Sequence, residues 1–149
     1  MNLLHNNTLG IDIGSTTVKI AVLDSEHHML FADYERHYAN IQETLALLLS
    51  RAKEKLGEMT VSPSITGSGG LTLSGHLNVP FTQEVVAVAT ALQDYAPQTD
   101  VAIELGGEDA KIIYFTGGID QRMNGICAGG TGSFIDQMAS LLQTDASGL

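Results

Sequence analysis

Apolar and polar residues alternate along the first part of the chain, which is the pattern of β-strands that bury one face. Three such runs, "TLGIDI", "TVKIAVLD" and "MLFADYERH", fall within residues 8–37 and are separated by short polar turns. The pattern predicts a three-stranded meander. A fourth short strand is expected at 63–66, "PSIT", and the glycine-rich stretch "GSGG" at 67–70 is interpreted as a loop and is by itself a weak functional signal.

Helical periodicity begins at Ile41, from which apolar residues recur every three or four positions as far as Leu56. Asn40 and Glu43 resemble a capping box at the start of this segment, and Gly57 supplies a stop signal at its end. The sequence therefore predicts one amphipathic helix over 41–56.

Two further helices are predicted in the second half of the chain. The apolar run at 83–95 is terminated by Pro97 and favours a helix, although it is also compatible with a strand. Another helix is expected to begin near 131–133, with an apolar face formed by Phe134, Ile135, Met138, Leu141 and Leu142.

The opening acid–glycine pattern occurs a second time. When Asp12 is aligned with Glu104, the same offset also aligns Gly14 with Gly106, Ser15 with Gly107, Lys19 with Lys111 and Ile20 with Ile112. Chance similarity of two glycine-containing hairpins is the alternative, but an internal duplication explains five matches better. A duplication predicts two lobes, 1–97 and 98–149, whose acid–glycine turns converge.

Composition restricts the classes of ligand. The chain has 149 residues, 44% of them apolar, and a formal net charge of −10. Because no broad basic face is possible, nucleic acid and anionic membranes are excluded as expected partners. A bound polyanion such as a nucleotide would have its charge met by backbone N–H groups and a divalent cation.

The sequence also indicates the cellular compartment of the protein. Its apolar runs are far shorter than the roughly 20 residues that a membrane-spanning helix needs, and its first residues lack a basic signal-peptide region. The single cysteine, Cys127, rules out an internal disulfide framework and fits a reducing environment. We therefore expect a cytoplasmic protein.

The two hairpins carry chemistry suited to nucleotide phosphates. A glycine at a hairpin tip lets backbone amides approach a phosphate, and Ser15, Thr16 and Thr17 add hydroxyl donors. Desolvating a carboxylate within an apolar strand is costly, so Asp12 is expected to have a partner such as a metal ion. Asp12 and Glu104 can bind Mg²⁺ through its waters or orient an attacking water. The remaining candidate phosphate-binding residues are Gly14, Lys19, Gly106, Gly107 and Asp109, the last of which is equally compatible with turn capping.

Two common nucleotide-binding motifs are absent from the sequence. No G-x-x-x-x-G-K-[ST] string is present, and no G-x-G-x-x-G follows a strand, so a P-loop and a Rossmann dinucleotide site are not expected.

Cys127 lies in a glycine-rich loop shortly before a predicted helix. A helix N-terminus favours the thiolate form, which suits a metal ligand or a nucleophile, whereas an inert core cysteine is the alternative. No nearby histidine or acid completes a local catalytic pattern with this residue, so nucleophilic catalysis is the weaker functional option.

Three stretches together resemble a known family: "GIDIGSTTVK" at 10–19, "IELGGEDAK" at 103–111 and "CAGGTGSF" at 127–134. They are similar to the ATP-dependent activators of 2-hydroxyacyl-CoA dehydratases and their relatives in benzoyl-CoA reductase. That family belongs to the actin, hsp70 and sugar-kinase superfamily. The resemblance implies an α/β ribonuclease H-like ATPase fold, with a first lobe and a truncated start of the second.

The resemblance also implies an activity. Activators of this family are homodimers that hold one [4Fe-4S] cluster between subunits, with two cysteines from each, and couple ATP hydrolysis to electron transfer into a dehydratase or reductase. Cys127 matches the first of those cysteines, and the two hairpins match the two phosphate motifs. Glu104 and Glu108 depart from the family pattern, which usually has Asp and Gln there.

The second cysteine and the adenosine-binding motif of the family are expected beyond Leu149. We therefore expect this sequence to be an N-terminal fragment that carries no stable cluster and hydrolyses ATP poorly. Two other functions remain open: a nucleotide-binding regulatory or scaffold lobe without redox chemistry, and a small-molecule kinase of the same superfamily.

Overall fold

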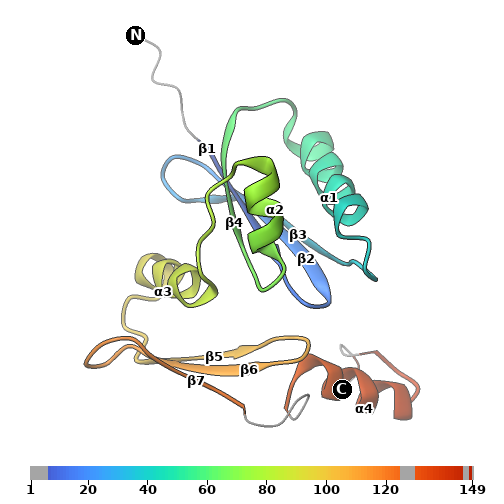
Figure 1. Cartoon of the computed structure of the whole chain (residues 1–149), viewed down its shortest axis with the longest axis vertical. Helices are drawn as coiled ribbons and strands as arrows, with labels where there is room; N and C mark the ends of the chain where they lie inside the picture. Colours follow the sequence, from blue (N-terminus) through green and yellow to red (C-terminus); the bar gives the residue numbers. More distant parts are fainter. Residues whose placement is uncertain (1–6, 125–129, 146–147, 149) are drawn as a thin grey trace. The chain divides into compact units, whose positions relative to one another are not determined.

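The computed structural model describes residues 7–124, 130–145 and 148, which form two compact units, Met1–Glu84 and Val85–Leu149 (Figure 1). The division falls at the start of helix α3 (Glu84–Tyr95), earlier than the lobe boundary that the sequence predicts between residues 97 and 98. Residues of α3 line a pocket together with Phe115 and Ile119, which explains why this helix groups with the second unit.

The first unit contains a four-stranded sheet with the order β3-β2-β1-β4. Strands β1 (Asn7–Ile13), β2 (Thr17–Leu23) and β3 (Met29–Arg36) form the predicted antiparallel meander. Strand β4 (Val61–Thr66) runs parallel to β1 and begins before the predicted 63–66 segment.

One face of this sheet forms the hydrophobic core. Leu9, Ile11 and Ile13 on β1 are buried and are paired across the ladder with Val22, Ile20 and Val18 on β2. Helix α1 (Ile41–Leu56) covers this face with the buried residues Leu45, Leu48 and Ala52. Because side chains alternate along a strand, Asp12, Lys19 and Thr66 lie on the opposite face.

Helix α1 has the predicted bounds, but its predicted cap is wrong. The Asn40 side chain makes no capping hydrogen bond; its main-chain carbonyl accepts the Thr44 N–H at 3.0 Å and the Thr44 hydroxyl at 2.8 Å. The chain enters the helix through Tyr38 and Ala39, which both have positive φ, at 44° and 69°. This corner takes the place of a capping box.

Helix α2 (Gly70–Leu77) follows β4 and was not predicted. The interpretation of "GSGG" as a loop is wrong for its last residue, since Gly70 already begins the helix. A Cβ on Gly70 would lie 2.7 Å from the Ile65 Cγ2 atom, so the absent side chain lets the first turn of α2 contact the core.

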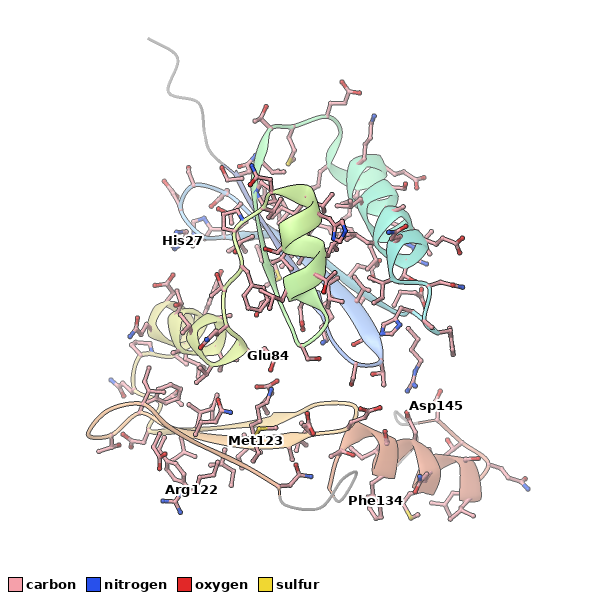
Figure 2. The ribbon with its side chains drawn as sticks, in the orientation of Figure 1. His27, Glu84, Arg122, Met123, Phe134 and Asp145 are labelled. Atoms are coloured by element: carbon pink, nitrogen blue, oxygen red, sulfur yellow. The ribbon has the colours of Figure 1, made fainter. Side chains whose placement is uncertain are left out.

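The second unit contains a three-stranded antiparallel sheet with the order β5-β6-β7. Its strands are β5 (Val101–Leu105), β6 (Ala110–Tyr114) and β7 (Asp120–Met123), and Ile113 is fully buried. On β7, the Arg122 guanidinium (Figure 2) lies 5.6 Å from the centre of the Tyr114 ring. The 83–95 segment forms a helix, as predicted, and not a strand.

Helix α4 (Gly132–Leu141) begins within the predicted range. Its predicted apolar face is only partly covered, because Phe134 (Figure 2), Leu141 and Leu142 are exposed and Ala139 is the buried residue of the helix. None of the helices in the described ranges is both long enough and apolar enough to cross a membrane.

Candidate functional site

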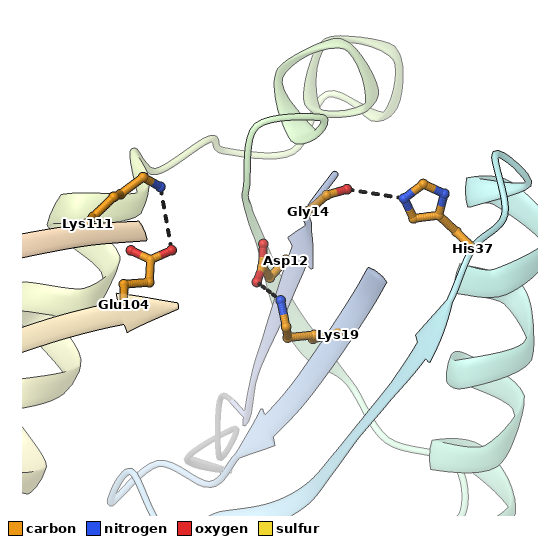
Figure 3. A network of polar contacts seen from close by, with 6 residues as sticks. All are labelled: Asp12, Gly14, Lys19, His37, Glu104 and Lys111. Atoms are coloured by element: carbon orange, nitrogen blue, oxygen red, sulfur yellow. Dashed lines mark hydrogen bonds and ion pairs between the residues drawn. The ribbon is translucent and has the colours of Figure 1, made fainter. Parts of the chain in front are cut away.

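The two acid–glycine hairpins have the same construction. Asp12 is paired in register with Lys19 across β1 and β2, and Glu104 is paired in register with Lys111 across β5 and β6 (Figure 3). At the tip of the first, the Gly14 N–H donates to the Thr17 carbonyl at 2.9 Å; at the tip of the second, the Gly106 N–H donates to the Asp109 carbonyl at 2.7 Å. The aligned residues therefore occupy equivalent positions, as a duplication predicts.

Asp12 forms a close ion pair, with its Oδ2 atom 2.7 Å from Lys19 Nζ. Its side chain is 33% exposed and that of Lys19 is 51% exposed. Lys19 is therefore one partner for the Asp12 carboxylate, and the metal role of Asp12 stays a prediction. Ile11 and Ile13 enter the core while Asp12 points to the opposite face, where Lys19 compensates its charge.

The carbonyl groups at the first turn are already engaged. The Ile13 carbonyl accepts the Gly69 N–H at 2.9 Å, and the Thr16 carbonyl accepts the His37 N–H at 3.2 Å. Nε2 of His37 lies 3.2 Å from the Gly14 carbonyl (Figure 3). The Ser15 and Thr16 amides, by contrast, have no hydrogen-bond partner within the part of the chain that the structure describes. Free amides beside engaged carbonyls give the turn a positive potential suited to an anion.

The second turn repeats this arrangement with different partners. The Gly106 carbonyl accepts the Gly132 N–H at 2.8 Å, and the Gly107 carbonyl accepts both the N–H and the hydroxyl of Ser133. These donors come from the first turn of α4. The Gly107 and Glu108 amides have no partner among the described residues, so this turn also presents two free donors.

The "GSGG" loop supports the first hairpin. Gly67 has φ +95°, and a Cβ there would collide with the Ile13 carbonyl and lie 2.5 Å from Asp12 Oδ1. A Cβ on Gly69 would lie 2.9 Å from Ile13 Cγ2. This loop is a weak functional signal in the sequence, yet its glycines let the chain pack directly on the end of β1 that carries Asp12.

Two buried oxygens at the hairpins have no partner among the described residues: Thr66 Oγ1 and Glu104 Oε2. Thr66 is the register partner of Asp12 on the neighbouring strand β4. Oε1 of Glu104 lies 3.5 Å from Lys111 Nζ, and the Lys111 side chain is only 11% exposed. The sequence identified Lys111 through the repeat but did not predict it as a site residue.

The Glu104 carboxylate fits a hydrated Mg²⁺ ion. Mg²⁺ prefers oxygen ligands and retains several waters, so a single carboxylate suffices together with phosphate oxygens. An unpartnered Glu104 Oε2 atom is free to accept a hydrogen bond from such a water. Within 7–124, 130–145 and 148, no cluster of three or more histidine, cysteine, aspartate or glutamate residues forms a dedicated metal cage.

The remaining predicted site residues differ in their exposure to solvent. Ser15 is exposed, whereas Thr16 and Thr17 are half-buried at the first turn. Asp109 is exposed and contributes its main-chain carbonyl to the second turn. Cys127 lies outside the described residues, so its role as a metal ligand stays a prediction.

Comparison with known proteins gives a consistent result. The profile of the BadF/BadG/BcrA/BcrD ATPase family matches residues 9–148. The activator of lactoyl-CoA dehydratase from Anaerotignum propionicum is 32% identical, over 92% of this chain and 54% of that protein.

Two solved structures are also similar. Component A of the Acidaminococcus fermentans (R)-2-hydroxyglutaryl-CoA dehydratase is 28% identical with a TM-score of 0.76, and the match covers 95% of this chain and 56% of that one. The activator of the 2-hydroxyisocaproyl-CoA dehydratase from Clostridium difficile, solved with bound ADPNP, is 26% identical with a TM-score of 0.74, over 95% and 54% of the two chains.

These likenesses confirm the fold class predicted from the sequence, the α/β ribonuclease H-like fold of actin, hsp70 and sugar kinases. The chain spans about half the length of the curated relatives that it matches, 56% of one and 54% of another.

Proposed function

This chain belongs to the BadF/BadG/BcrA/BcrD ATPase family, and we propose that its two acid–glycine hairpins bind the phosphates of Mg²⁺–ATP. Asp12 and Glu104 hold the hydrated Mg²⁺ or orient the attacking water, and the free turn amides bind the phosphate oxygens. Lys19, the Thr16 and Thr17 hydroxyls and Asp109 complete the proposed site. Mg²⁺ held there would neutralise charge that develops on the transferred phosphate.

This proposal rests on one structural observation. Each of two turns far apart in the sequence combines an in-register acid–lysine pair with engaged carbonyls and two amides that have no partner among the described residues. A single hairpin of this kind is a common structural element, but the same donor arrangement twice in one chain is suited to a ligand with several phosphates. The similar activator from Clostridium difficile was solved with an ATP analogue, ADPNP, which supports this choice of ligand.

We further propose that the whole protein is an ATPase that activates a 2-hydroxyacyl-CoA dehydratase or a related reductase. The names of the relatives support this role. In this proposal ATP hydrolysis drives low-potential electron transfer into the partner enzyme, and the activator works as a homodimer in the cytoplasm. The reducing cytoplasm suits Cys127, which in this proposal remains a thiolate.

The iron–sulfur part of this activity does not fit one copy of this chain alone. A [4Fe-4S] cluster takes four thiolates, and the chain contains one cysteine, Cys127. We propose that Cys127 supplies one ligand and that the others come from the rest of the whole protein and its dimer partner. The isolated 149-residue chain is expected to carry no stoichiometric iron or sulfide and to hydrolyse ATP poorly.

Titration calorimetry with Mg²⁺–ATP tests the nucleotide site. Asp12→Asn should weaken binding at least about tenfold, which corresponds to about 1.4 kcal/mol, because it removes the charge that holds the hydrated ion. Glu43→Gln, which neutralises an exposed carboxylate on α1, is the matched control and should bind as the wild type does. Equal affinities for Asp12→Asn and wild type would refute the proposed role of Asp12.

A further inference from the structure

We propose that His37 is a positioning residue for the first phosphate-binding turn. It holds the turn's carbonyls, and it thereby keeps the Ser15 and Thr16 amides available for phosphate. This inference rests on the nucleotide role proposed above for that turn. His37 has no ligand-like spacing in the sequence, and its importance comes from contacts that only the fold creates.

His37 reaches the turn in two ways. The residue follows β3 and is 9% exposed. Its main-chain N–H donates to the Thr16 carbonyl at 3.2 Å, and its ring Nε2 lies 3.2 Å from the Gly14 carbonyl (Figure 3). Gly14 and Thr16 flank Ser15, so one residue restrains the turn on both sides of its exposed tip.

The hydrogen bonds of the His37 imidazole ring define which of its two nitrogens carries a hydrogen. A carbonyl oxygen only accepts, so Nε2 must carry the hydrogen that is shared with Gly14. The Ala39 N–H donates to Nδ1 at 3.0 Å, so Nδ1 must be unprotonated. The ring is therefore neutral, and each nitrogen has a different partner: Nε2 holds the phosphate-binding turn and Nδ1 holds the corner after β3.

That corner is strained. Tyr38 and Ala39 are consecutive non-glycine residues in the left-handed region, with φ of 44° and 69°. Tyr38 is 80% exposed, so burial of its side chain does not offset the strain. The corner is closed by the Ala39 contact with Nδ1 and by the Asn40 N–H, which donates to the His37 carbonyl at 2.6 Å. Strain that persists in a folded protein is concentrated at functional sites, and here its result is the placement of the His37 ring.

Two substitutions separate the functions of the two nitrogens. In His37→Gln the side-chain amide nitrogen replaces Nε2 and keeps a donor for the Gly14 carbonyl. In His37→Asn the amide oxygen replaces Nδ1 and keeps the acceptor for the Ala39 N–H, but the donor to Gly14 is lost. Each variant keeps one of the two ring contacts, and thermal unfolding monitored by circular dichroism reports whether it folds.

The experiment measures the affinity of the full 149-residue chain for Mg²⁺–ATP by calorimetry. His37→Asn should bind about five- to tenfold more weakly, the effect expected for one lost hydrogen bond in an otherwise intact site. His37→Gln should bind within about twofold of wild type, because the donor to the turn is retained. A second measurement without nucleotide records the ¹⁵N order parameters and chemical shifts of Ser15 and Thr16, which should change in His37→Asn and be preserved in His37→Gln.

The proposal is overturned if His37→Asn leaves both the affinity and the Ser15 and Thr16 signals unchanged. It is also overturned if both variants lose affinity equally and in proportion to their loss of stability, since a purely structural role predicts that outcome. If wild type does not bind Mg²⁺–ATP, the proposed function fails. The nucleotide-free signals then decide the role of His37 alone: altered signals in His37→Asn support it and unchanged signals refute it.

Discussion

Asp12 and Lys19 face each other across the β1–β2 ladder, and their charged atoms lie 2.7 Å apart on the sheet face opposite the core. In the ligand-free protein, Lys19 compensates the negative charge of the Asp12 carboxylate. A phosphate at the turn offers Lys19 a second anionic partner, and the carboxylate that it leaves can then face the cation. The pair is therefore central to the proposed nucleotide site.

Lys19→Met should weaken Mg²⁺–ATP binding about tenfold, the size of effect expected from one lost charge-assisted contact. The substitution keeps most of the aliphatic length but removes the ammonium group. Calorimetric titration measures the change. Lys53→Met removes an exposed ammonium group that pairs with Glu58 and should leave the affinity as in wild type. Equal losses in both variants would show that only the overall charge matters.

Gly67→Ala should destabilise the first unit by about 3 kcal/mol or more, because a Cβ at φ +95° would overlap the Ile13 carbonyl and crowd Asp12 Oδ1. Gly75→Ala is the control, since nothing lies within 4 Å of a Cβ there and the residue is inside α2. It should stabilise the protein by about 0.5–1 kcal/mol. Urea unfolding compares the two, and similar stabilities would contradict the packing of the "GSGG" loop on β1.

Leu48→Ala should cost about 3 kcal/mol, since the side chain is fully buried between α1 and the sheet. Its neighbour Leu47 is 45% exposed, and Leu47→Ala should change the stability by less than about 0.5 kcal/mol. The free energy of unfolding in urea gives both values. If Leu47→Ala proved the more costly substitution, the assignment of the buried face of α1 would be incorrect.

The β2–β3 turn should loosen in acid. The His28 N–H donates to the Asp24 carboxylate and lowers its pKa, and the Glu26 N–H acts in the same direction. A carboxyl group whose pKa is lowered on folding stabilises the fold above its ordinary pKa and loses that contribution as the pH falls through the lowered value. The amide shifts of Glu26 and His28 should therefore titrate below the usual range for aspartate. Asp24→Ala should abolish this transition, and a midpoint above that range would contradict the assignment.

Local patterns predicted most of the fold, because alternation and helical periodicity are properties of the residues themselves. The bounds of α1 and the meander follow from such patterns. Helix α2 was missed because glycines at its start have low helix propensity and mask its apolar residues. The predicted side-chain cap at Asn40 was wrong because the chain enters α1 through the strained Tyr38–Ala39 corner.

Only part of the candidate site follows from local patterns in the sequence. The repeat identified both acids and both lysines because residues that pair in a hairpin keep a fixed spacing. The contacts of Gly67, His37 and Ser133 with the turns depend on segments that are distant in the sequence, and no local pattern reports them. A glycine-rich stretch after a strand was the one signal that pointed to Gly67.

The most direct test of the account is an NMR titration of the ¹⁵N-labelled chain with Mg²⁺–ADPNP. If both hairpins bind the same nucleotide, the amide signals of Ser15 and Thr16 and those of Gly107 and Glu108 should shift together and saturate with a single dissociation constant. Shifts confined to one hairpin, or two different dissociation constants, would contradict the central claim that the two turns share one polyphosphate.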